Sequence, residues 1–139
     1  MRITIKVALI GLLGSTASMW GRQAPSASTT RPEGTWKGES TCLVHPSGCN
    51  DEESVYRFSK ALQENQVTLS ANKIVNAKEI NMGTGLCEYG AAKSVIECPL
   101  PNGSTIHFDV AGDAMQGTMK LKDGKPWRKI RLKRTSSER

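Results

Sequence analysis

The sequence predicts an all-β fold, an antiparallel up-and-down meander of eight or nine short strands that closes into a small barrel. Three observations support this prediction. Short segments in which apolar and polar residues alternate recur along the chain, short turns separate them, and no segment has a convincing helical period. A meander of this kind avoids open sheet edges by closing on itself.

The first 17 residues have the three parts of a secretory signal peptide. Residues 1–6 are basic, residues 7–13 are apolar, and Ser15–Ala17 supply the small residues of a cleavage site. The apolar run is much shorter than the ~20 residues of a membrane-spanning helix. We therefore expect a secreted or periplasmic protein without a transmembrane segment in the mature chain.

The rest of the chain divides into a lead-in, one domain and a tail. Residues 18–33 are rich in Ser, Thr, Ala and Pro and lack any period, which predicts a disordered lead-in. The barrel domain is expected over residues 34–134, and residues 135–139 are expected to be a flexible tail.

Four cysteines follow the predicted cleavage site, at Cys42, Cys49, Cys87 and Cys98. Their even number and two close pairs favour the disulfides Cys42–Cys49 and Cys87–Cys98 among the three possible connectivities. Such bonds fit an oxidising compartment outside the cytoplasm. The first would close a turn that contains Pro46–Gly48, and the second would join the two strands of a hairpin.

Strands are expected in the following order. The first half provides Gly34–Thr41, Ser54–Ser59, Gln66–Ala71 and two short strands within residues 73–82 around Asn76–Ala77; the second half provides the hairpin between Cys87 and Cys98, then Thr105–Val110, Met115–Lys122 and Lys125–Arg134. Residues 60–65 are long enough for only one helical turn. Met82–Gly85 is expected to be a turn or bulge, and Asn102–Gly103 a tight turn.

The last hairpin has a predictable register. If Asp123–Gly124 form a two-residue turn, the inner face pairs Leu121 with Pro126, Met119 with Arg128, Gly117 with Ile130, and Met115 with Leu132. The outer face then places Lys120 beside Trp127, Thr118 beside Lys129, and Gln116 beside Arg131.

We call Lys120, Trp127, Lys129 and Arg131 the basic ladder. Residues 120–134 carry a net charge of +7, whereas the rest of the expected mature chain carries about −3. Two interpretations are open: a solvated strand surface that discourages edge pairing, or a face that binds an acidic envelope component, such as lipid headgroups, polysaccharide or an acidic protein. Nucleic acid is not expected, because the chain is exported and has few aromatic residues on which bases stack.

No group of residues suggests an enzyme, a metal site or a cofactor. His45 lies in a turn and His107 on an outward strand face, and the cysteines are used in disulfides. Glu52 and Glu53 are adjacent, so an extended strand points them to opposite sides. Single glycines at turns do not form a phosphate-binding loop.

Gly34–Trp36, the barrel pattern and the ending Arg131–Arg134 together resemble small calycin barrels of the lipocalin kind. The whole chain is also similar to small exported bacterial proteins with no assigned activity. In the calycin group a basic residue near the end of the last strand lies across the first-strand tryptophan. The resemblance implies barrel closure by Trp36 and Arg134, while Arg128 is expected to reach out past the rim.

These observations lead to two functional hypotheses. The first is a non-catalytic module that binds a small, partly apolar ligand inside the barrel; its expected lining is Gly38, Ser40, Met115, Gly117 and Met119. The alternative is a protein-binding inhibitor or envelope-interaction protein that acts through the Cys42–Cys49 loop or the basic C-terminal hairpin.

Overall fold

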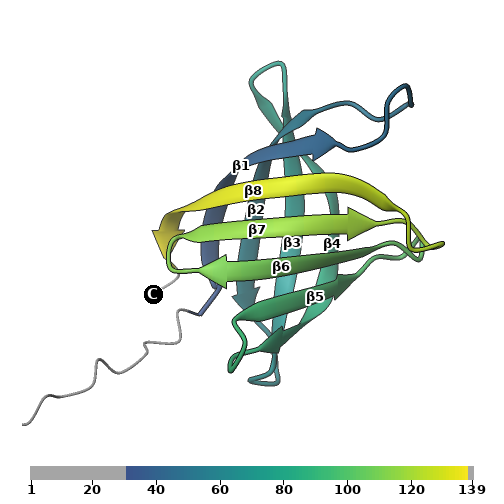
Figure 1. The fold of residues 1–139 in the computed structure, drawn as a ribbon. Helices are drawn as coiled ribbons and strands as arrows, with labels where there is room; N and C mark the ends of the chain where they lie inside the picture. The colour runs from purple at the N-terminus through teal and green to yellow at the C-terminus, as the bar shows by residue number, and fades with distance from the viewer. Residues whose placement is uncertain (1–30, 138–139) are drawn as a thin grey trace, which may run out of the picture.

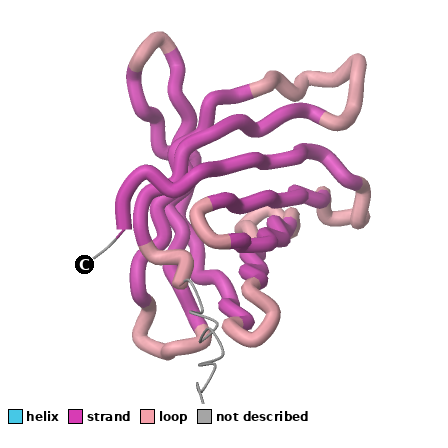
Figure 2. Tube along the Cα trace, turned by 60° about the vertical axis from the view of Figure 1, so that its left-hand side comes forward, coloured by secondary structure: helices cyan, strands magenta, loops and turns pink. Residues whose placement is uncertain are grey.

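The computed structural model describes residues 31–137, which form a closed antiparallel barrel without any helix (Figures 1 and 2). Its strands are β1 (Gly34–Cys42), β2 (Glu52–Lys60), β3 (Gln66–Val75), β4 (Lys78–Gly90), β5 (Val95–Pro99), β6 (Thr105–Ala111), β7 (Ala114–Lys120) and β8 (Pro126–Ser137). Each strand pairs with the next, and β8 pairs with β1. The predicted fold class is confirmed, with eight strands rather than nine.

Several predicted boundaries differ from those of the structure. The two short strands expected within residues 73–82 are the ends of β3 and β4, joined by Asn76 and Ala77, whose φ values are 50° and 62°. Residues 61–65 form a turn and bends. The last strand, β8, continues to Ser137. The predicted signal peptide, lead-in residues 18–30 and residues 138–139 lie outside the described residues.

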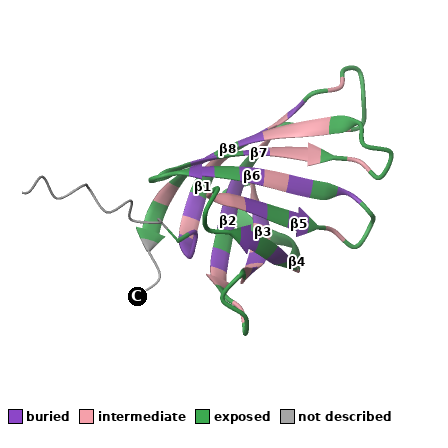
Figure 3. Ribbon diagram, turned by 60° about the horizontal axis from the view of Figure 1, so that its bottom comes forward, coloured by how far each residue is buried: buried purple, intermediate pink, exposed green. Residues whose placement is uncertain are grey.

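Alternation along the strands places one face of the sheet inside the barrel. On β6, Ile106, Phe108 and Val110 are buried while Thr105 and Asp109 are exposed, and Figure 3 shows the resulting stripes. Side chains of an extended strand alternate between its two faces, which gives this two-residue period. The same period in the sequence predicted the barrel.

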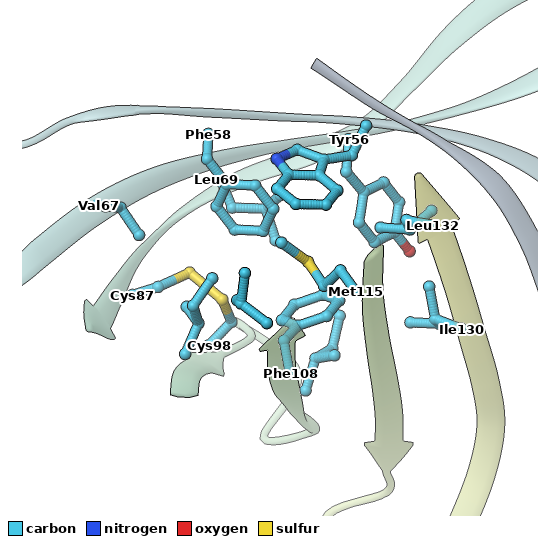
Figure 4. Packing of buried hydrophobic residues seen from close by; sticks show 14 of the residues in the cluster. Tyr56, Phe58, Val67, Leu69, Cys87, Cys98, Phe108, Met115, Ile130 and Leu132 are labelled. Carbon is cyan, nitrogen blue, oxygen red and sulfur yellow. A yellow bond between two sulfur atoms is a disulfide. The ribbon is translucent and has the colours of Figure 1, made fainter. Parts of the chain in front are cut away.

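Side chains from every strand, most of them aromatic or branched, fill the centre of the barrel (Figure 4). Phe108 stands edge-on to two rings, with centroids 6.0 Å from that of Tyr56 and 5.6 Å from that of Phe58. Met115 lies among these rings and is 1% exposed. The interior is therefore a packed core over much of its length rather than a channel.

Both predicted disulfides are present. Cys42–Cys49 closes the β1–β2 loop, whereas Cys87–Cys98 lies in the core and joins β4 to β5. We call the end that carries the β1–β2 and β3–β4 connections the open end, because the cavity described below lies there. Arg31–Glu33, the start of β1 and the end of β8 lie at the opposite, closed end (Figure 1).

The last hairpin keeps most of its predicted register but corrects its turn. Met119 opposes Arg128, Gly117 opposes Ile130 and Met115 opposes Leu132. However, Lys120 pairs with Pro126, so the predicted pairs Leu121–Pro126 and Lys120–Trp127 are wrong.

The cause is a turn one residue longer than expected. The N–H of Leu121 donates to the carbonyl of Lys125, and Gly124 has φ +84°, the left-handed conformation of a three-residue loop with a glycine bulge. Trp127 is then an extra residue opposite the Met119–Lys120 step, and this second irregularity restores the predicted pairing.

Candidate functional site

A cavity of about 410 Å³ occupies the open end of the barrel. It is lined by Ser40, Glu52, Tyr56, Leu69, Ala71, Met82–Gly85, Leu100–Asn102, Ile106, Met119 and Arg128. These residues come from β1–β4, β6–β8 and the β5–β6 loop. The volume lies within the range of small-molecule sites, roughly 300–1,000 Å³.

The cavity has an apolar wall and a polar side. Leu69, Ile106 and Met119 belong to the apolar wall. The polar side is organised by Arg128, whose guanidinium donates to Ser40 Oγ at 3.2 Å and lies 3.5 Å from Glu52 Oε1. Lys73 Nζ is also 3.5 Å from Glu52 Oε1. A molecule in the cavity would therefore meet apolar surface on one side and an ion pair on the other.

Tyr56 lies between this polar side and the core. Burial, with the nearby Glu52 carboxylate as a second cause, raises the pKa of Tyr56 to about 12. The phenol is therefore neutral at physiological pH. It can offer a ligand a hydroxyl group, but no negative charge.

Of the five predicted lining residues, Ser40 and Met119 line the cavity and the other three do not. Met115 is buried in the core. A Cβ at Gly117 would lie 2.7 Å from the Phe108 ring, so this glycine makes room for that ring rather than for a ligand. A Cβ at Gly38 would lie 1.8 Å from the carbonyl oxygen of Arg131, so Gly38 allows β8 to approach β1 closely.

The expectation that Arg128 reaches out past the rim is wrong. Its side chain is 14% exposed and turns toward Ser40 and Glu52. Its strand parity with Ile130 and Leu132 indicated this direction, and the carboxylate that stabilises it comes from β2, 76 residues away in the sequence. Sequence reasoning assigned Glu52 no partner, although Glu52 shares the inward parity of Tyr56.

At the closed end, Arg134 and Trp36 are brought together. The Arg134 Cζ lies 4.4 Å from the centroid of the Trp36 ring. The guanidinium also donates to the carbonyls of Glu33, at 2.5 Å, and Arg31, at 2.7 Å, while the Trp36 indole donates to the Pro32 carbonyl at 2.8 Å. Residues 31–33, expected to be disordered, are thus held against the barrel.

Glu33 is buried within this closure. Burial acts to raise the pKa of Glu33, but the Arg31 hydrogen bond and one from its own backbone outweigh it, so the pKa is lowered. Arg31 Nη2 lies 2.6 Å from Glu33 Oε1, and Arg31 Cζ lies 5.7 Å from the Tyr89 ring centroid. Sequence reasoning missed this group, because the lead-in has no period from which to infer a contact.

The basic ladder lies on the outer face of β7 and β8, with Thr118 opposite Lys129 and Gln116 opposite Arg131, as in the predicted register. Lys120 and Arg131 are exposed, whereas Lys129 and Trp127 are half-buried. The pairing of β1 with β8 adds two neighbours that were not anticipated: Glu39 lies opposite Arg131, and Lys37 opposite Lys133.

A second hollow, of about 550 Å³, lies near the adjoining ends of β1 and β2. It is lined by Lys37, Gly38, Glu39, Thr41, Asp51, Glu52 and Glu53. This lining carries four carboxylates and no large apolar side chain. It therefore differs from the cavity inside the barrel, which we take as the candidate site.

The histidines lie away from the cavity lining. His45 contacts the Cys42 carbonyl within its own loop, and His107 lies on the outer face of β6 between Glu97 and Asp109. Within residues 31–137, no three His, Cys, Asp or Glu side chains are grouped to hold a metal ion. The same residues include no helix long and apolar enough to span a membrane.

Comparisons of the chain with protein-family models, curated proteins and solved structures found no match. The cavity and the surfaces of the barrel are therefore the features from which a function is proposed below.

Proposed function

We propose that this protein is an exported, non-catalytic β-barrel that binds a small, partly apolar molecule in the cavity at its open end. The observation that carries the proposal is the cavity itself, which combines an apolar wall with the Arg128–Glu52 pair. Pockets with mostly apolar walls and a few placed polar groups are typical of small-molecule sites. The two disulfides are compatible with a periplasmic or extracellular location.

The arrangement also favours a particular kind of ligand. A molecule with an apolar body would pack against Leu69, Ile106 and Met119, and a polar group would face Arg128 and Ser40. The Trp36–Arg134 contact further supports the proposal that the barrel is calycin-like.

The test uses 1-anilinonaphthalene-8-sulfonate, an anionic probe with an apolar body, in fluorescence titrations. Ala71→Phe should fill part of the cavity and weaken probe binding about tenfold or more, whereas Ala114→Phe, at an exposed position outside the lining, should not. Equal binding by both variants would overturn the proposal. Independently, native mass spectrometry of the protein purified from its own host would identify a molecule that co-purifies with it.

We also propose a second function, binding of an acidic envelope component to the basic ladder. The specific observation is that Lys37 and Lys133 lie directly opposite each other beside the ladder, a like-charge pair that an anion would relieve. Binding to phosphatidylglycerol vesicles should be weaker in a triple variant that combines Lys120→Gln, Lys129→Gln and Arg131→Gln. Binding that is insensitive to both this variant and salt would reject this function.

A further inference from the structure

We infer that the ligand of the open-end cavity is an amphiphilic anion, with an aliphatic body and one carboxylate-like group that pairs with Arg128. This inference rests on the proposed ligand-binding function and names the chemistry of its ligand. Arg128 and Glu52 are the two charged residues of the cavity lining, and Lys73 contacts Glu52 beside them. We call these three residues the charged cluster. It holds two cations and one carboxylate, so its net charge is +1.

The guanidinium of Arg128 has hydrogen-bond donors left for a ligand. In the described part of the chain, its N–H groups meet Ser40 Oγ at 3.2 Å, the Ser40 carbonyl at 3.5 Å and Glu52 Oε1 at 3.5 Å. All three distances exceed the roughly 2.7–2.9 Å of a strong charge-assisted bond. A guanidinium has several N–H groups arranged as a fork that matches a carboxylate. A ligand carboxylate can therefore bind Arg128 without displacing a strong contact.

Burial makes the excess charge of the cluster selective. The side chains of Arg128 and Glu52 are 14% and 17% exposed, and that of Lys73 is 34% exposed. Charges that are largely removed from water interact more strongly with an added charge than surface charges do. A ligand anion would bring the cluster to two cations and two carboxylates. A neutral hydroxyl group would leave the excess charge in place, and a cationic group would add to it.

The groups around the cluster also favour an anion. Tyr56, which is neutral at physiological pH, lines the cavity, and its hydroxyl can donate to a carboxylate. Three other carboxylates of the open end, those of Glu39, Asp51 and Glu53, line the second hollow and are exposed. Solvent and salt screen exposed charges. They therefore repel a ligand anion less than the buried cluster attracts it.

The apolar wall indicates the body of the ligand. Its larger side chains are aliphatic or thioether groups: Leu69, Met82, Leu100, Ile106 and Met119. Methionine side chains are flexible and adapt to the shape of what they contact. The cavity of about 410 Å³ is also of small-molecule size. A single aliphatic chain that ends in a carboxylate meets both the wall and the charged cluster.

The experiment compares decanoate, decanol and decylammonium, which share one aliphatic chain and differ in charge. Isothermal titration calorimetry at neutral pH, below the concentration at which each probe forms micelles, measures the affinities. Decanoate should bind the wild type at least about tenfold more tightly than decanol, and decylammonium should bind more weakly than decanol. Ala71→Phe should weaken the binding of decanoate and decanol alike, because it fills part of the cavity.

Variants of the charged cluster separate the effect of charge from that of cavity shape. Arg128→Gln should weaken decanoate binding about tenfold or more and leave decanol binding within about threefold, whereas a purely structural loss would weaken both. Glu52→Gln should strengthen decanoate binding several-fold, because it removes the carboxylate that repels the probe. Lys93→Gln is the matched control: it also removes one charge, but in the exposed β4–β5 turn, outside the cavity lining.

The outcomes distinguish this inference from the proposed function. Equal affinities of the wild type for decanoate and decanol, equal weakening of both by Arg128→Gln, or weaker decanoate binding by Glu52→Gln would each overturn the inference and leave the cavity as a ligand site. Should Arg128→Gln fail to fold, the probe series with the wild type and Glu52→Gln still decides the question. If no probe binds, or if Ala71→Phe leaves decanol binding unchanged, the proposed function is rejected and the inference with it.

Discussion

Arg134 makes several different interactions at the closed end of the barrel. Its guanidinium lies over Trp36 and donates to two backbone carbonyls of residues 31–33, and its Nε lies 3.2 Å from Asp113 Oδ1. A planar group with several N–H donors suits this position, whereas a lysine would not reproduce it. The side chain thus connects β8 to the segment that enters β1.

Arg134→Ala should lower the free energy of unfolding by about 2–3 kcal/mol, from the lost ring contact and two hydrogen bonds. Arg128→Ala should cost about 1 kcal/mol, because Glu52 keeps Lys73 as a partner. Urea denaturation followed by tryptophan fluorescence checks both values. Equal losses, with no change in the emission of the Arg134 variant, would show that the Trp36 contact does not stabilise closure.

His107 gives a pH-dependent contribution to stability. The hydrogen bond to Glu97 raises the pKa of His107 above its ordinary value of 6.5. Folding therefore favours the protonated ring: the added stability is complete below pH ~6.5 and is lost as pH rises through the folded pKa. Because the ring is 42% exposed, the effect should be below about 1 kcal/mol.

In His107→Gln the urea midpoint should accordingly change less between pH 5.5 and 8 than it does in the wild type. His45→Gln is the control, because that side chain lies in the β1–β2 loop away from Glu97. If the two variants show the same pH profile, the ion pair with Glu97 is not the cause.

At the scale of elements, strand alternation was predictable and irregular backbone was not. The two-residue period assigned Ile106, Phe108 and Val110 to the interior, as the structure shows. The bulge at Trp127 and the three-residue turn were missed, because Asp-Gly also fits a two-residue turn. The β5–β6 loop had no period that could place Leu100 and Pro101 on the cavity.

Gly117 allows β7 to pack closely against the Phe108 ring because it has no side chain. Gly117→Ala should lower the free energy of unfolding by about 1–3 kcal/mol, because its Cβ would meet the Phe108 ring at 2.7 Å. In a background of Phe108→Leu, the same change should cost less, a coupling that calorimetry or urea titration can measure. Gly48→Ala, with open space around the added Cβ, should have little effect; additive costs at residues 117 and 108 would contradict this packing.

At the scale of the whole molecule, the two disulfides have unequal positions. Cys87 and Cys98 are almost fully buried and join β4 to β5 beside a short pairing, whereas Cys42–Cys49 closes a surface loop. Loop closure alone stabilises each by a similar amount, about 2.5–3 kcal/mol. The buried bond also fills core volume, which the surface bond does not.

Replacing Cys87 and Cys98 together by Ala should therefore lower the melting temperature more than replacing Cys42 and Cys49. The additional loss should be about 1–3 kcal/mol, from the missing sulfur packing. Differential scanning calorimetry of both double variants checks this order. A greater loss for the Cys42 and Cys49 variant would mean that the open-end loop, rather than the β4–β5 join, limits stability.

The seam between β1 and β8 sets an order of assembly. Every other pairing joins neighbours along the chain, but Arg134 meets the Glu33 carbonyl across 101 residues. Bringing such distant segments together costs entropy that local hairpins do not, so we expect the hairpins to form early and the seam to close last. During synthesis the barrel cannot close until β8 has been made. Until then, β1 and β7 each expose an edge with which another chain could pair.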